Sequence, residues 1–116
     1  MRFLCIYRRD EAPAEACPPN AQEQVAMGAL IEEMTKAGVL LATEGCMPSQ
    51  HGFKMRVEDG KFTVTDGPFA ETKEMVCGMA LLQCKSREEA EYWTRRFLAT
   101  TGSGTSEVRQ LYDASC

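Results

Sequence analysis

The order of apolar and polar positions along the chain predicts several short strands. The run RFLCIY (2–7) is apolar and β-prone, and VLLAT (39–43) is continuously apolar, as in a buried strand. A longer apolar run, MVCGMALLQC (75–84), predicts a central strand, and EVRQLYD (107–113) predicts the last one. Short apolar runs of this kind, bounded by turn residues, are typical of strands in a sheet.

Strict alternation between residues 53 and 65 predicts a β-hairpin. Every second residue of FKMRVE (53–58) and of KFTVT (61–65) is apolar, and Asp59-Gly60 between them is a strong two-residue turn signal. Because successive side chains of a strand point to opposite faces, we expect one dry face and one wet face. The dry face would carry Phe53, Met55, Val57, Phe62 and Val64, and the wet face Lys54, Arg56 and Glu58.

The first helix is predicted over about 21–37. Asn20 is a good N-cap, Glu23 lies three positions further on as in a capping box, and Gly38 is a typical C-terminal glycine. The apolar residues follow the i, i+3, i+4, i+7 spacing of a one-sided helix. They are Met27, Leu30, Ile31 and Met34.

A second helix is predicted over about 87–99, after a second capping box made by Ser86 and Glu89. One face of this helix carries Ala90, Trp93, Thr94 and Phe97. We interpret the aromatic residues here, and the methionines of the first helix, as core rather than as parts of a cofactor site.

The predicted order is β-α-β-β-β-β-α-β. Without the hairpin it corresponds to a split β-α-β, which is an α+β, ferredoxin-like antiparallel sheet with two helices on one face. The 116 residues fit a single domain, 1–116. The other sheet face would expose apolar residues, so we expect a homodimer packed through this open sheet face with C2 symmetry.

Composition excludes several classes of function. The net charge is −4 and the basic residues are scattered, which argues against direct nucleic-acid binding. No apolar run reaches the roughly 18 residues of a membrane span, and the N-terminus is unlike a signal peptide. We therefore expect a cytoplasmic protein without a membrane segment.

The six cysteines do not predict a disulfide framework or a metal site. No two of them have C-x-x-C spacing, and His51 is the only histidine. The chain has no glycine-rich phosphate loop and no cluster of ligands. We expect no metal, nucleotide or flavin cofactor.

The stretch TDGPFAETKE (65–74) predicts a sharp corner after the hairpin. Asp66 ends a strand, Gly67 tolerates the restriction imposed by Pro68, and Phe69 can anchor the loop. One interpretation is purely structural, with Asp66 accepting hydrogen bonds from backbone N–H groups of the turn. The other is that the corner aims the Asp66 carboxylate into a cleft as a general base or ligand anchor.

Further candidate binding residues flank this corner or lie at the same edge of the predicted sheet. Asp66 and a nearby carboxylate such as Glu71 can in principle share acid and base roles. The other candidates are Tyr7 at the end of the first strand, Glu44 after the second, Arg56 on the wet face of the hairpin, and Lys73 beside the corner.

The motif VTDGPFAETKE (64–74) closely resembles the signature of DGPF-domain proteins, a branch of the YCII-related superfamily. The resemblance covers nearly the whole chain, including RFLCIYRRDE (2–11), AGVLLATEGCMPS (37–49) and VRQLY (108–112). It implies a ferredoxin-like fold in a dimeric α/β barrel, a bacterial origin, an unsettled function, and an association of some relatives with sigma factors.

The wider superfamily also implies a His–Asp pair as an active site. In its YCII members the histidine lies earlier in the chain, where the first helix here has none. The available pair is His51 and Asp66, which the hairpin would bring to the same end.

Three functions follow from these observations. The first is a dimeric module that binds a small molecule, or a regulatory partner, in a cleft beside the corner. The second is a cofactor-free enzyme with Asp66, and His51 beside it, as acid and base. The third is a regulatory partner of a sigma factor, which rests on the family resemblance alone.

Overall fold

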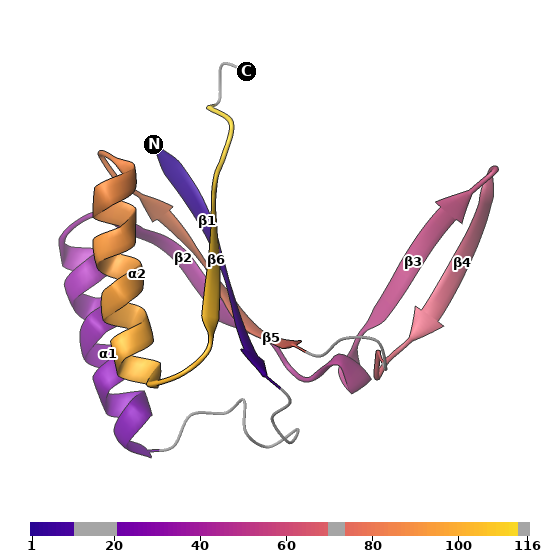
Figure 1. The fold of residues 1–116 in the computed structure, drawn as a ribbon, viewed down its shortest axis with the longest axis horizontal. Helices are drawn as coiled ribbons and strands as arrows, with labels where there is room; N and C mark the ends of the chain where they lie inside the picture. The colour runs from indigo at the N-terminus through magenta and orange to yellow at the C-terminus, as the bar shows by residue number, and fades with distance from the viewer. Residues whose placement is uncertain (11–20, 70–73, 114–116) are drawn as a thin grey trace.

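The computed structural model describes residues 1–10, 21–69 and 74–113. It contains an antiparallel sheet with two helices on one face and a separate hairpin (Figure 1). The elements are β1 (Arg2–Asp10), α1 (Ala21–Lys36), β2 (Leu40–Gly45), the short 3₁₀ turn η2 (Ser49–His51), β3 (Phe53–Glu58), β4 (Lys61–Asp66), β5 (Glu74–Gln83), α2 (Arg87–Thr101) and β6 (Thr105–Gln110). The predicted element order and the α+β class are confirmed.

The four strands of the main sheet lie in the order β2-β5-β1-β6, and every neighbouring pair is antiparallel. This is the strand order of a ferredoxin-like sheet, with the predicted central strand β5 between β2 and β1. The hairpin β3-β4 forms its own two-stranded sheet between β2 and β5 in the sequence. The split β-α-β prediction with an added hairpin is therefore confirmed.

The core lies between the sheet and the helices. Alternate residues of β1 point into it, beginning with Phe3, and Leu82 pairs with Phe3 from β5. Leu30 and Met34 of α1 and Trp93 of α2 close the core from the helix side. The predicted assignment of Met34 and Trp93 to the core is confirmed, and Phe97 packs against it.

Local capping signals of α2 are formed as the sequence predicts. The Ser86 hydroxyl oxygen accepts a hydrogen bond from the Glu89 backbone N–H at 3.1 Å. The Glu89 carboxylate reaches back to the N–H of Lys85 at 3.1 Å, one residue before the N-cap. At the other end Gly102 adopts a left-handed conformation and its N–H binds the Leu98 carbonyl. The Asn20 cap of α1 lies outside the described residues.

Strand boundaries differ from the prediction where pairing extends beyond the apolar run. The first strand continues from Tyr7 to Asp10, because the charged residues after Tyr7 still pair with β5. The last strand is Thr105–Gln110, not 107–113.

The expectation of a buried second strand is wrong. Val39 precedes β2 and is buried, but Leu41 to Gly45 are exposed because β2 is an edge strand.

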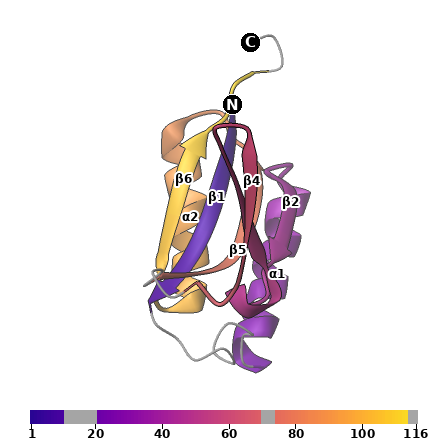
Figure 2. The ribbon, with the colours of Figure 1, turned by 90° about the vertical axis from the view of Figure 1, so that its right-hand side faces the viewer.

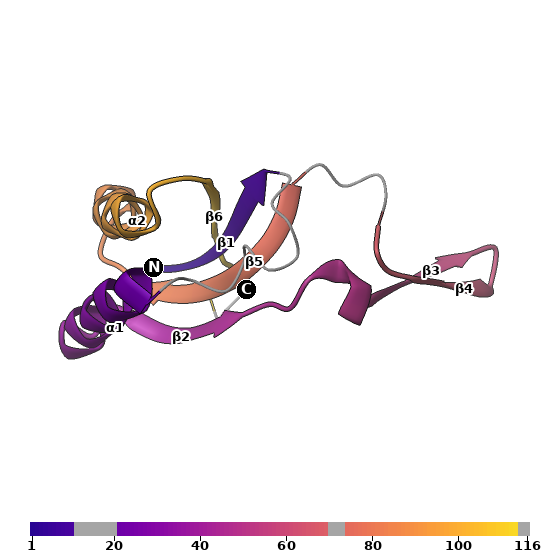
Figure 3. The ribbon, with the colours of Figure 1, turned by 90° about the horizontal axis from the view of Figure 1, so that it is seen from below.

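The hairpin projects from the body of the molecule. In Figures 1 and 3 the helices, the main sheet and the hairpin follow one another, and in Figure 2 the hairpin lies in front of the sheet. The hairpin therefore stands on the side of the sheet away from the helices. The radius of gyration is 16.0 Å, against about 13 Å for a compact domain of this length. The predicted alternation is confirmed, but the expectation of a dry face is wrong for the single chain, since every residue of β3 and β4 is exposed.

The corner at the base of the hairpin is held by backbone contacts. The Gly67 N–H donates to the Gly52 carbonyl at 3.0 Å, and the Phe69 N–H donates to Ser49 Oγ at 3.3 Å. A Cβ on Gly67 would lie 1.7 Å from the Ser49 carbonyl oxygen, so only glycine fits there. The Gly67–Pro68 peptide is cis. The backbone N–H groups of Gly67 and Phe69 therefore donate to residues 49–52. The purely structural interpretation of the motif had instead expected N–H groups of the turn to donate to the Asp66 carboxylate.

None of the helices in the described part of the chain is both long and apolar enough to cross a membrane.

Candidate functional site

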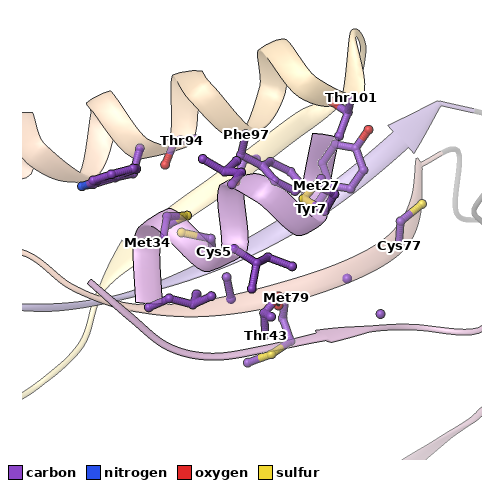
Figure 4. Close-up of a pocket in the computed structure, with 18 of the residues that line it drawn as sticks. Cys5, Tyr7, Met27, Met34, Thr43, Cys77, Met79, Thr94, Phe97 and Thr101 are labelled. Carbon is purple, nitrogen blue, oxygen red and sulfur yellow. Dashed lines mark hydrogen bonds between the residues drawn. The ribbon is translucent and has the colours of Figure 1, made fainter. Parts of the chain in front are cut away.

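A cavity of about 320 Å³ lies between the helices and the main sheet. Its lining side chains come from β1, α1, β5 and α2 (Figure 4). One end is closed by apolar core residues such as Leu30, Met34, Leu82 and Trp93. The small side chain of Ala80 lines the sheet side of the cavity, where a larger one would take up space. The volume is at the lower end of the range found for sites that bind small molecules.

The apolar walls are rich in sulfur. The sulfur-containing residues that line the cavity are Cys5, Met27, Met34, Cys77 and Met79. Methionine side chains are unbranched and polarizable, so a wall of this kind adapts to ligands of different shape. Burial raises the pKa of the Cys5 thiol. At neutral pH Cys5 is therefore protonated and contributes an apolar surface, not a nucleophilic thiolate.

One hydroxyl in the wall has no satisfactory partner. Thr94 Oγ1 is buried and makes no hydrogen bond of ordinary geometry within the described residues. The Thr94 hydroxyl faces the neighbouring Cys5 sulfur as a donor, and sulfur is only a weak acceptor. Thr94 projects from α2 toward the sheet in Figure 4. A buried hydroxyl without a partner is unfavourable, so a bound oxygen or nitrogen atom at this position would be stabilised.

Tyr7 reaches the cavity from β1 and is held on two sides. Its ring packs edge to face against Phe97 with centroids 4.9 Å apart, and its hydroxyl donates to the Ser103 carbonyl at 2.6 Å. A Cβ on Gly104 would lie 2.5 Å from the ring, so the glycine makes room for it. The phenol oxygen keeps its acceptor lone pairs.

The polar lining residues cluster at the Tyr7 end of the cavity. They come from the ends of elements that meet at this edge of the sheet: Arg9, Glu23, Glu44, Thr101 and Ser106. The cavity thus has an apolar end and a polar end. Such a site suits a molecule with a hydrophobic body and a few polar atoms.

The residues predicted from the sequence do not form one site. Tyr7 and Glu44 line the cavity. Arg56 lies on the wet face of the hairpin, where it pairs with Glu58 at 3.5 Å. Glu71 and Lys73 lie outside the described residues. A ligand role for each of them stays a prediction.

Asp66 and His51 lie at the base of the hairpin. Asp66 pairs with Phe53 in the strand register, and Phe53 lies two residues after His51. His51 and Asp66 are therefore at the same end of the hairpin, as expected. Both side chains are exposed. No hydrogen bond or ion pair joins the two side chains in the described structure, and neither lines the cavity. The acid–base pair therefore stays a prediction.

The cleft was expected beside the corner, and the cavity lies elsewhere. Among residues 66–69 none contributes to its lining. The important residues that sequence reasoning did not select are Thr94, Ala80 and Phe97. Thr94 was visible as the one hydroxyl on the apolar face of the second helix, and that mismatch is the signal that could have identified it.

Comparison with known proteins gives the family of the chain. The model of the YCII-related domain matches residues 1–115. An uncharacterized protein of Rhizobium meliloti (strain 1021) is 32% identical over 114 residues, which covers 96% of this chain and 92% of that protein.

One solved structure is similar over nearly the whole chain. It is the 5-chloro-2-hydroxyhydroquinone dehydrochlorinase from Burkholderia phenoliruptrix AC1100, in complex with 2,5-dihydroxybenzoquinone. The similarity has a TM-score of 0.45 at 14% identity and covers 99% of this chain and 97% of that one.

Because the family model matches residues 1–115, the chain belongs to the YCII-related domain family.

Proposed function

We propose that this protein is a binding module for a small, largely apolar molecule held between the helices and the sheet. The observation that supports the proposal is a cavity of about 320 Å³ that combines apolar walls with the unsatisfied Thr94 hydroxyl. A ring or short chain with one oxygen atom would fill the apolar end and hydrogen-bond Thr94. Its remaining polar groups would face Tyr7 and the polar end.

The chemistry of the lining favours binding over reaction. Cys5 has a raised pKa and is protonated at neutral pH. A cofactor-free enzyme with Asp66 and His51 as acid and base remains the alternative, and it requires a second copy or a movement of the chain to bring these groups to a ligand. A role as a sigma-factor partner rests on the family resemblance.

The proposal is tested with two probes of similar shape, benzene and phenol. Dry apolar cavities bind benzene. Phenol adds a hydroxyl group, which can serve as the missing hydrogen-bond partner of Thr94 Oγ1. We expect both to bind, with phenol binding more tightly, as measured by ligand-observed NMR and by the rise in melting temperature. In a Thr94→Val variant the preference for phenol should disappear, while benzene binding persists.

A cavity-filling variant supplies the decisive control. Ala80→Leu places a larger side chain on the sheet floor and should abolish binding of both probes. Ala29→Leu makes the same change at an exposed position of α1 and should leave binding unchanged. Circular dichroism verifies that both variants fold. Equal binding of the probes to a folded Ala80→Leu variant and to the parent protein would show that the cavity is not the binding site.

A further inference from the structure

The cavity between the helices and the sheet is elongated. Thr94 and Thr101 of α2 both line it and lie two turns apart (Figure 4), which is about 10 Å along a helix axis. On β1 the cavity extends from Cys5, whose side chain interacts with Thr94, to Arg9. Four residues of a strand cover about 13 Å. A ligand that uses the whole cavity is therefore longer than a single ring.

The middle of the cavity is apolar on both the helix side and the sheet side. Met27 and Ile31 of α1 and Phe97 of α2 line it from the helices, and Ala80 lines it from the sheet. Polar atoms are thus left to its two ends. The buried Thr94 hydroxyl is near one end, and Tyr7 and Thr101 are at the other.

The two hydroxyls at the Tyr7 end act as acceptors toward a ligand. The Tyr7 hydroxyl donates its hydrogen to the Ser103 carbonyl at 2.6 Å. The Thr101 hydroxyl lies 2.9 Å from the same carbonyl and 3.1 Å from that of Leu98. Because carbonyl oxygens only accept, both hydroxyl hydrogens are used within the protein, and the oxygen lone pairs remain. A ligand group at this end has to supply donors.

The charge at the same end is negative. Among the described residues that line the cavity, the charged ones are Arg9, Glu23 and Glu44, which sum to −1. One guanidinium N–H of Arg9 also donates to Ser103 Oγ, at 3.3 Å. The whole chain has the same sign, with a net charge of −4. A field of this sign attracts cations and disfavours a carboxylate.

We propose that the ligand is a linear, cationic amino alcohol, with its ammonium group at the Tyr7 end and its hydroxyl at Thr94. This inference rests on the binding function proposed above. A primary amine is protonated at neutral pH, as the lysine side chain is. Its three N–H donors match the oxygen acceptors at the Tyr7 end. An extended chain advances about 1.2 Å per bond, so the 10 Å between the two ends corresponds to about eight or nine bonds.

The probe that matches this length is 8-amino-1-octanol, and isothermal titration calorimetry measures its dissociation constant. We expect it to bind at least about tenfold more tightly than 8-hydroxyoctanoate, which carries the opposite charge on a similar chain. The shorter 4-amino-1-butanol cannot reach both ends and should bind at least about 100-fold more weakly.

The two ends of the ligand are tested separately. Octylamine lacks the hydroxyl and should bind about fivefold more weakly than 8-amino-1-octanol. In Thr94→Val the two amines should bind equally. At the other end, Glu23→Gln/Glu44→Gln changes the summed charge from −1 to +1 and should abolish the preference for the amine over 8-hydroxyoctanoate.

The matched control for the charge change is Glu88→Gln/Glu91→Gln. It removes the same two charges from exposed positions of α2 that do not line the cavity, so the preference should persist. Circular dichroism verifies that both double variants fold. A preference lost equally in both would show that the charge of the whole chain selects the amine, and this would overturn the proposed site of the ammonium group.

The outcomes separate this inference from the binding function on which it rests. If benzene and phenol fail to bind as well, the cavity is not a binding site and both proposals fall. If these two rings bind but 8-amino-1-octanol is no tighter than 8-hydroxyoctanoate, the amino alcohol is overturned and the cavity remains a binding site. Equal binding of octylamine and 8-amino-1-octanol to the parent protein also overturns it, because the contact with Thr94 would then be absent.

Discussion

The main sheet and the hairpin are built from the same alternation, with opposite results. In β1 the residues from Phe3 to Tyr7 bury every second side chain beneath the helices. In β4 the same alternation leaves Phe62 and Val64 exposed. The pattern determines which residues share a face. It does not determine what covers that face, because the helices cover β1 and no element of the described residues covers Phe62 and Val64.

The largest expected effect separates burial in the core from exposure on the hairpin. Leu82 is 2% exposed, and Leu82→Ala removes side-chain atoms from the centre of the core. We expect the free energy of unfolding to fall by about 3 kcal/mol at any protein concentration. For Val64→Ala the change in the dilute monomer should stay below about 0.5 kcal/mol.

Denaturant titration at a low and a high protein concentration checks this contrast. The cost of Leu82→Ala should be large at both concentrations. A large cost of Val64→Ala in the dilute protein would mean that the hairpin packs against its own chain.

The next effect concerns the corner that joins the two regions. Gly67→Ala would place a Cβ 1.7 Å from the Ser49 carbonyl oxygen, so the backbone of the corner must move. We expect amide exchange of residues 49–69 to accelerate at least tenfold. The body should keep its near-ultraviolet circular dichroism from Trp93.

Gly52→Ala is the matched control, since a Cβ there meets the same Ser49 oxygen at an ordinary 3.6 Å and φ is −124°. Equal effects of the two substitutions would show that steric room at Gly67 does not hold the corner.

Sequence patterns predicted the elements that depend on nearby residues. The Ser86 capping box, the Asp59-Gly60 turn and the alternation of the hairpin all use contacts within a few positions, so they can be read locally. The exposed edge position of β2 could not be read from its apolar run, because strand order depends on pairing with distant residues.

The site was harder to predict than the fold. Asp66 belongs to a distinctive motif, yet the structure uses that motif to bind the η2 segment through Gly67 and Phe69. The cavity arises where α1 and α2 cross small residues of β5, and no short stretch of sequence encodes such a space. Only Thr94, a hydroxyl on an apolar helix face, gave a local sign of it.

A smaller effect tests the body alone. Ser86→Ala removes the side-chain acceptor for the Glu89 N–H at the start of α2. We expect the free energy of unfolding to fall by about 1 kcal/mol. The loss should be the same in the parent protein and in a Phe53→Ser/Phe62→Ser background, since the cap and the hairpin share no contacts among the described residues and distant effects add. Thermal denaturation of the four proteins measures this, and a loss that depends on the hairpin would show that the two regions are coupled.

The smallest effect is a pH dependence at the main sheet, where Glu107 of β6 pairs with two arginines. Hydrogen bonds from Arg109, and then from Arg8, lower the pKa of Glu107 from its ordinary value of 4.5. A carboxyl with a lower pKa in the folded state stabilises the fold above its unfolded pKa. That contribution is lost as the pH falls below 4.5 and through the folded value. Carbon NMR of the Glu107 carboxyl should therefore show a midpoint below 4.5, and Arg109→Gln should raise it. An unchanged midpoint in Arg109→Gln would show that the Arg109–Glu107 pair does not form in solution.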